Sequence, residues 1–215
     1  MIQNIFLNNG ESLNLLFFGA HSDDIEIGCG GTLLKLIKSY NIEKIKWIVF
    51  SANKIRKNEG KLSAAKFTDD VNRKEIIINN FRDGFFPFEG NLIKEYFESI
   101  KNDFSPDIIF THYRKDLHQD HRIISDLTYN TYRNHFIIEY EIPKYDGDFG
   151  NPNVYFELEK DICNKKIGII TESFISQANK HWFSNDAFLS ILRLRGIECG
   201  TKYAEAFYCH KMMLK

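Results

Sequence analysis

The sequence lacks the features that identify secreted, membrane-spanning and thiolate-metal proteins. Its first residues, MIQNIFLNNGES, do not combine a basic segment with a long apolar stretch, as a secretory signal does. Nowhere does the chain reach the ~18 uninterrupted apolar residues of a membrane span. No two cysteines form a CxxC pair, which excludes a cysteine-rich zinc site; the four are Cys29, Cys163, Cys199 and Cys209. A disulfide framework is also unexpected in a chain of 215 residues, so we expect a cytoplasmic protein with no membrane span.

An excess of charge of one sign is absent as well. The chain has 28 basic and 29 acidic side chains, so its net charge is −1. Broad electrostatic capture of nucleic acid or anionic lipid is therefore not expected. Hydrophobic residues make up 43% of the chain, with 19 Phe and 10 Tyr among them, which supplies a large core and argues against disorder. At roughly 150 residues per domain, residues 1–215 are expected to form one domain, with a core at 13–135 and further C-terminal elements at 136–215.

Short apolar runs alternate with segments of helical periodicity along the chain. Strands are expected at residues 13–20, 44–52, 107–113, 136–142, 154–158 and 204–212. Helices are expected at residues 28–40, 64–80, 92–103, 118–132, 161–178 and 185–195. Alternation of this kind indicates βαβ units, and hence an α/β fold with a mainly parallel sheet, a Rossmann-like three-layer sandwich.

Side chains that bind metals are concentrated after two of the expected strands. The first group, after residues 13–20, comprises His21, Asp23 and Asp24. The second, at the end of the strand 107–113 and beyond it, comprises His112, Asp116, His118, Asp120 and His121. Four of the seven histidines lie in these two groups. Open α/β sheets place function beyond the carboxyl ends of their strands, so the sequence predicts a site at that edge of the sheet.

The spacing within both groups suits a divalent metal. His21 and Asp24 lie three residues apart in a tight loop, and His118 and His121 lie three apart at the start of an expected helix. Catalytic zinc favours three nitrogen or oxygen ligands and leaves a fourth position to water. His21, Asp24 and one of the two later histidines supply that set. The remaining histidine and Asp23 are then left as proton-transfer groups.

Each of these residues also has a purely structural interpretation. Asp23 or Asp24 alone would serve as a helix N-cap, and Asp120 would favour the N-terminus of its own helix. The segment Gly28-Cys29-Gly30-Gly31-Thr32 would allow close packing of a helix, and it does not fit the GxGxxG dinucleotide fingerprint. Both groups would have to mislead for the metal site to fail, so the metal interpretation is preferred.

Two segments carry a resemblance to a known family. The sequences AHSDDIEIGCGGT (residues 20–32) and HYRKDLHQDHR (residues 112–122) resemble the signature pair of the PIG-L/LmbE-like zinc-dependent N-deacetylases. Ser22 stands where that family usually has proline, which implies a slightly looser loop. Weaker similarities, including an arginine and a glutamate that the family carries on its second helix, fall at Arg73-Lys74-Glu75, Ser176-Gln177, Arg195-Gly196 and residues 203–207.

The resemblance implies a division of labour among six residues. It assigns His21, Asp24 and His121 to one Zn²⁺, although such a set also accommodates iron, manganese or cobalt. Asp23 would be the general base. His118, as an imidazolium, would stabilise the oxyanion or protonate the leaving amine, with the Asp120 side chain holding its ring. The implied activity removes an N-acetyl group from an N-acetylglucosamine-type sugar or conjugate by attack of a zinc-bound water.

Two rival functions remain: a zinc amidase acting on a non-sugar conjugate, and a non-catalytic sugar- or nucleotide-binding module. A homo-oligomer is also left open. The loop 145–153 is a candidate for holding a sugar ring. Arg73 and Glu75 could line the pocket rim or pair across a helix. A basic stretch could meet a phosphate or carboxylate, or could be solvated; it contains Lys54, Arg56 and Lys57.

Overall fold

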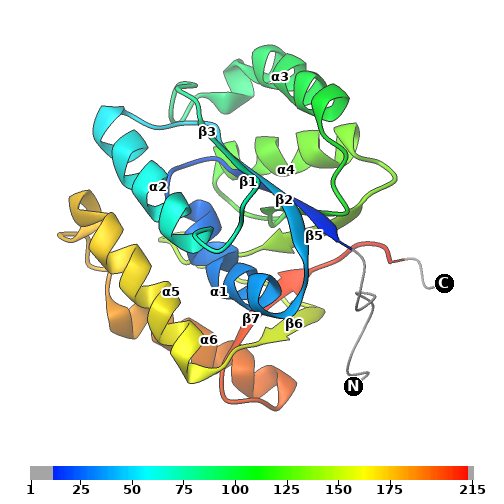
Figure 1. Ribbon diagram of the computed structural model, residues 1–215. Coiled ribbons are helices and arrows are strands. Elements are labelled where there is room, and N and C mark those ends of the chain that lie inside the picture. Colours follow the sequence, from blue (N-terminus) through cyan, green and yellow to red (C-terminus); the bar gives the residue numbers. More distant parts are fainter. Residues whose placement is uncertain (1–11, 213–215) are drawn as a thin grey trace.

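A seven-stranded sheet forms the centre of the protein in a computed structural model that describes residues 12–212 (Figure 1). The strands are β1 (Leu13–Gly19), β2 (Ile42–Val49), β3 (Lys74–Ile78), β4 (Ile108–His112), β5 (Phe136–Tyr140), β6 (Val154–Glu157) and β7 (Ala204–Tyr208). Their order is β3-β2-β1-β4-β5-β7-β6. Strands β1 to β5 pair in parallel, and β7 runs antiparallel to both β5 and β6. The expected mainly parallel α/β sheet is therefore confirmed.

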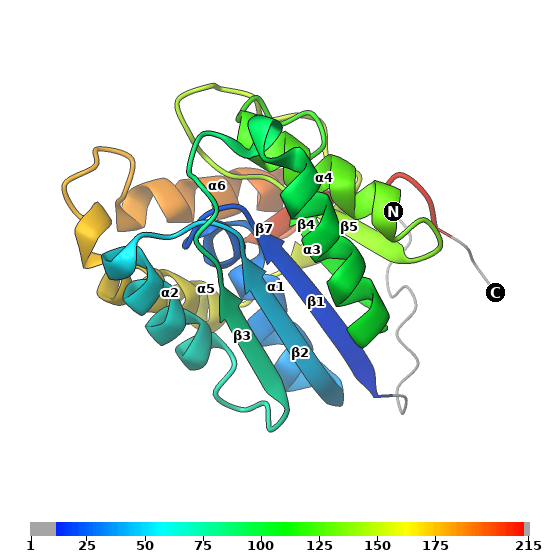
Figure 2. The same cartoon turned by 90° about the horizontal axis from the view of Figure 1, so that it is seen from above.

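Helices cover both faces of this sheet. They are α1 (Asp24–Ser39), α2 (Lys54–Phe67), α3 (Gly90–Asp103), α4 (Gln119–Thr131), α5 (Lys160–Ser173) and α6 (Asn185–Cys199), with 3-10 turns η1 (Phe86–Phe88) and η2 (Ile175–Gln177). Figure 2 shows α3 and α4 on one side of the sheet and α1, α2 and α5 on the other. Across residues 12–212, no helix is both long and apolar enough to cross a membrane.

The apolar run of β1 serves two cores at once. Leu15 and Phe17 belong to the cluster beneath α1, α2 and α5, whereas Leu16 and Phe18 belong to the cluster beneath α3 and α4. All four side chains are fully buried. Successive residues of a strand point to opposite faces, so a strand covered on both sides must be apolar throughout.

The prediction of one helix over residues 64–80 was wrong, because this region contains the end of α2 and all of β3. Helix α2 begins ten residues earlier, because the side chain of Asn53 accepts hydrogen bonds from the N–H groups of Ile55 and Arg56 and caps it. It ends at Phe67, and the isoleucine run that follows forms β3 at the edge of the sheet. An edge strand with one polar end lacks clear alternation, which explains why it resembled a continuation of the helix.

Helix α1 begins at Asp24 and not near Gly28 as expected, so the glycine-rich segment lies inside it. A Cβ on Gly28 would lie 2.1 Å from Cδ2 of Tyr140. That ring is fully buried, and its hydroxyl donates to the Phe18 carbonyl, so it has little freedom to move. The glycine therefore permits the close packing of α1 on β5.

We expect Gly28→Ala to lower the free energy of unfolding by about 1–3 kcal/mol, because the new methyl group overpacks this contact. Gly168→Ala on α5 is the matched control. No neighbouring atom lies within 4 Å of its Cβ position, so we expect a gain of roughly 0.5–1 kcal/mol from helix propensity. Urea unfolding measures both. A Gly28→Ala protein as stable as the wild type would contradict the packing argument.

Candidate metal centre

The two groups of polar residues meet where β1 and β4 end. These strands are neighbours in parallel register, with Phe17 opposite Phe110. The chain leaves β1 toward α1 on one face and leaves β4 toward α4 on the other face. A crevice at such a divergence is the usual binding place in open α/β sheets. Here it brings the loop containing His21 against the start of α4, which carries His121.

Three ligand atoms form a nearly equilateral triangle in this crevice. Nδ1 of His21 lies 3.3 Å from Nε2 of His121 and 3.5 Å from Oδ2 of Asp24. The third side, from His121 Nε2 to Asp24 Oδ2, is 3.6 Å. Tetrahedral ligands about 2.0–2.1 Å from a zinc ion are roughly 3.3–3.4 Å apart. The donor set and its spacing therefore fit a divalent metal, with His121 as the second histidine.

His121 is turned toward this triangle by a carboxylate behind it. Its Nδ1 lies 3.0 Å from Oδ2 of Asp116, which leaves Nε2 free to face the metal position. Burial, with the neighbouring His112 ring, lowers the pKa of His121 to about 3. A neutral imidazole is the form that binds metals. Asp116 lay in the group identified from the sequence, but its role was missed.

Asp24 is held as a carboxylate at the N-terminus of α1. Its Oδ2 accepts a hydrogen bond from the His21 main-chain N–H at 2.6 Å. Nε2 of His112 lies 3.2 Å from the same oxygen. Burial acts to raise the pKa of Asp24, but the His121 and His112 rings outweigh it and hold that pKa well below its ordinary value. His112 had no role assigned from the sequence; its Nε2 accepts a hydrogen bond from the Ala20 main-chain N–H at 2.9 Å, which ties the end of β4 to the loop that carries His21.

Asp23 occupies the N-cap position of α1, yet its side chain makes no capping hydrogen bond. Instead, Oδ1 lies 2.7 Å from Nη2 of Arg56. Burial raises the pKa of Asp23 above its ordinary value, with the charge of Arg56 opposing that change. A carboxylate with a raised pKa is a better proton acceptor near neutral pH. Ser22 is buried beside it, packed toward Gly60 of α2.

Arg56 fits neither alternative for the basic stretch: its side chain is largely buried, and the carboxylate that it binds is Asp23 of the chain itself. Its guanidinium lies 4.9 Å from the centre of the Phe174 ring and 3.5 Å from Glu59. Glu59 in turn accepts hydrogen bonds from the N–H and hydroxyl of Ser176. Helix α2 and the turn after α5 together fix the cation that faces Asp23.

We expect Arg56→Met to lower kcat/KM for the reaction proposed below by about 10- to 100-fold, since Asp23 loses the group that orients it and balances its charge. Lys54→Met is the matched control, because Lys54 is exposed at the start of the same helix. Steady-state kinetics on both proteins measure the difference. Equal losses in the two variants would show that charge near the site, and not the Asp23 contact, is responsible.

His118 is the N-cap of α4, and its Nδ1 accepts a hydrogen bond from the Asp120 main-chain N–H at 3.2 Å. The neutral ring therefore carries its proton on Nε2, the atom from which it can donate. Burial and then the charge of His21 lower the pKa of His118. The lowered pKa favours the neutral ring over the imidazolium that the resemblance implies.

The Asp120 side chain was expected to hold the His118 ring, but it makes its hydrogen bonds elsewhere. Its carboxylate accepts hydrogen bonds from the N–H groups of Gly84 (2.7 Å) and Phe86 (3.2 Å). It also lies 3.4 Å from Nε2 of His21. The Asp120 side chain, in the first turn of α4, thus reaches the loop after β3, while its main-chain N–H donates to the His118 ring that caps the helix. Asp120 thereby supports the ring of His21, whose Nδ1 is one corner of the ligand triangle.

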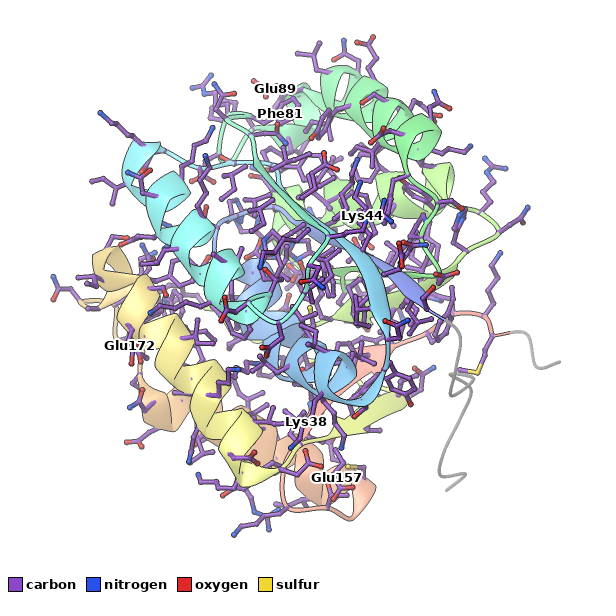
Figure 3. The ribbon with its side chains drawn as sticks, viewed as in Figure 1. Lys38, Lys44, Phe81, Glu89, Glu157 and Glu172 are labelled. Carbon is purple, nitrogen blue, oxygen red and sulfur yellow. The ribbon has the colours of Figure 1, made fainter. Side chains whose placement is uncertain are left out.

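Arg73 and Glu75 lie away from this crevice, so their interpretation as rim residues was wrong. Arg73 directly precedes β3 and Glu75 is the second residue of that strand, so neither is on the second helix. Arg73 pairs with Glu43, and Glu75 lies 3.2 Å from Lys44. Figure 3 labels Lys44, the partner of Glu75 near the amino end of β3, and Phe81, which follows the carboxyl end of the same strand.

Comparison with known proteins identifies relatives of this arrangement. The PIG-L family, described as GlcNAc-PI de-N-acetylase, matches residues 16–132, just over half of the 215 residues. N,N'-diacetylchitobiose deacetylase from Pyrococcus horikoshii has a similar structure, with a TM-score of 0.72 and 20% identity over 91% of this chain and 83% of that chain. The zinc-inhibited form of teicoplanin deacetylase Orf2 has a TM-score of 0.71 and 13% identity, over 91% of this chain and 97% of that chain. The 4-carboxy-2-hydroxymuconate hydratase GalB from Pseudomonas putida KT2440 has a TM-score of 0.68 and 12% identity, over 94% of this chain and 98% of that chain. One fold therefore carries deacetylases and a hydratase.

Proposed function

Since the chain belongs to the PIG-L family, we propose that it is a zinc-dependent hydrolase that removes the N-acetyl group of an N-acetylglucosamine-type sugar or sugar conjugate. The observation that carries the proposal is the ligand triangle of His21, Asp24 and His121, with sides of 3.3–3.6 Å, set beside a raised-pKa carboxylate at Asp23. A binding module needs no such base. The deacetylases of similar structure support the choice of reaction.

Zn²⁺ held by His21, Asp24 and His121 would supply Lewis acidity, which polarises an amide carbonyl and acidifies water. The protein's own groups do the rest. Asp23 accepts the proton of the attacking water as the new C–O bond forms. His118 donates its Nε2–H to the carbonyl oxygen as negative charge develops there. The proton held by Asp23 then passes to the nitrogen as the C–N bond breaks, and acetate and a free amine leave.

Three exposed apolar side chains favour a conjugate over a small free sugar. Exposed apolar side chains stand next to residues of the site in the sequence: Leu117 beside His118, Ile55 beside Arg56, and Phe85 beside Phe86, which packs against His21. Exposed apolar side chains beside the residues of a site suit an apolar group attached to the sugar. The loop 145–153 remains a candidate for the sugar itself.

A panel of amides tests the proposal. The panel contains N-acetylglucosamine, N,N'-diacetylchitobiose, an aryl N-acetylglucosaminide and an N-acetylated amino acid, and acetate and amine are both measured with Zn²⁺ present. Release from the sugars alone, best from the aryl glycoside, is expected. Release only from the amino acid would favour the non-sugar amidase. Tight sugar binding without release would favour the binding module.

A further inference from the structure

Lys144, in the loop after β5, contacts Asp116, the carboxylate that orients the candidate metal ligand His121. Nζ of Lys144 donates to Oδ2 of Asp116 at 2.8 Å. The same oxygen lies 3.0 Å from Nδ1 of His121. One carboxylate oxygen thus stands between an ammonium group and the ring whose Nε2 faces the metal position.

Asp116 holds more than this ring. Its second oxygen accepts the main-chain N–H of His118 at 2.7 Å. The carboxylate is 1% exposed, so its position depends on these partners and not on water. It fixes the ligand His121 and the backbone of the oxyanion donor His118 together.

Lys144 is itself held in place by a second carboxylate. Asp148 lies 2.7 Å from its Nζ and accepts the main-chain N–H of Leu117, also at 2.7 Å. The Lys144 side chain is only 13% exposed. The loop after β5 and the loop after β4 are therefore tied through one cation that faces two acids.

We propose that Lys144 is a positioning residue for His121 and acts through Asp116. This inference rests on the proposed metal site. Without the ammonium group, Asp116 becomes a buried carboxylate with no cationic partner among these contacts, and such a group is costly to keep in place. The carboxylate then relaxes, and His121 loses the hydrogen bond that directs Nε2. Partners of this kind commonly change metal affinity by about 10- to 100-fold.

Zinc affinity of the metal-free protein is the readout, measured by competition with a chromogenic chelator. We expect Lys144→Met to bind Zn²⁺ about tenfold more weakly than the wild type, and Lys144→Arg to recover most of that loss. Asp148→Asn leaves the contact between Lys144 and Asp116 in place, so it should stay within roughly twofold of the wild type. A loop-tethering role alone would instead weaken Asp148→Asn as much as Lys144→Met.

Lys35→Met is the matched control. Lys35 donates to the Glu157 carbonyl. In Figure 3, Glu157 lies at the opposite end of the molecule from Phe81, which follows the carboxyl end of β3. Thermal unfolding of each metal-free variant verifies that it is folded, and Lys144→Gln replaces Lys144→Met if the latter is not. Wild-type zinc affinity in a folded Lys144→Met or Lys144→Gln protein overturns the inference. Absence of zinc binding by the wild type would overturn the proposed function first.

Discussion

Asp23→Ala is expected to lower kcat for acetate release by about 100- to 1,000-fold while the protein still binds one metal ion per chain. Removing a general base or an electrostatic group at the reacting atoms commonly lowers kcat by factors of this size. Metal binding is retained because Asp23 is committed to Arg56 and is not part of the ligand triangle. Metal analysis and single-substrate kinetics on the same preparation measure both quantities.

Asp69→Ala is the control for this variant, because Asp69 is an exposed aspartate in the turn after α2. It should keep wild-type kcat. If Asp23→Ala hydrolyses the substrate as fast as the wild type, the assignment of the base is wrong. If it loses its metal as well, Asp23 belongs to the ligand set and the base must be sought elsewhere.

The second large effect concerns the metal itself. We expect His121→Ala to weaken zinc binding by more than about 100-fold and to abolish acetate release at ordinary zinc concentrations. The substitution removes one corner of the triangle and leaves Asp116 without the ring it orients. Equilibrium dialysis against Zn²⁺ measures the affinity.

His135→Ala controls for the loss of any histidine, since His135 follows α4 at the end remote from His121. It should bind zinc as the wild type does. Equal zinc affinity in His121→Ala and the wild type would mean that another of the clustered histidines completes the site, His118 being the first alternative.

The position of the site could be predicted from the sequence because its chemistry follows directly after apolar strands. The motif around His21 and the motif around His121 each predict a strand followed by candidate metal ligands, and parallel strands bring such ends together. The choice between His118 and His121, however, depends on which ring Asp116 orients. Only the folded chain shows that His118 is turned into a helix cap.

Other contacts could not be read from the sequence, because their partners are distant along the chain. Arg56 meets Asp23 through the placement of α2, whose start depended on the cap at Asn53 and was missed. Lys144 meets Asp116 only because β5 pairs with β4. Local patterns indicate elements and motifs, whereas ion pairs between elements follow from how the sheet orders its strands.

The central claim is tested most directly by acetate release from an N-acetylglucosamine conjugate before and after metal removal. The purified protein should contain about one zinc per chain, lose activity on treatment with a chelator, and regain it when one equivalent of Zn²⁺ is restored. Undiminished acetate release by protein shown to be free of metal would contradict the account.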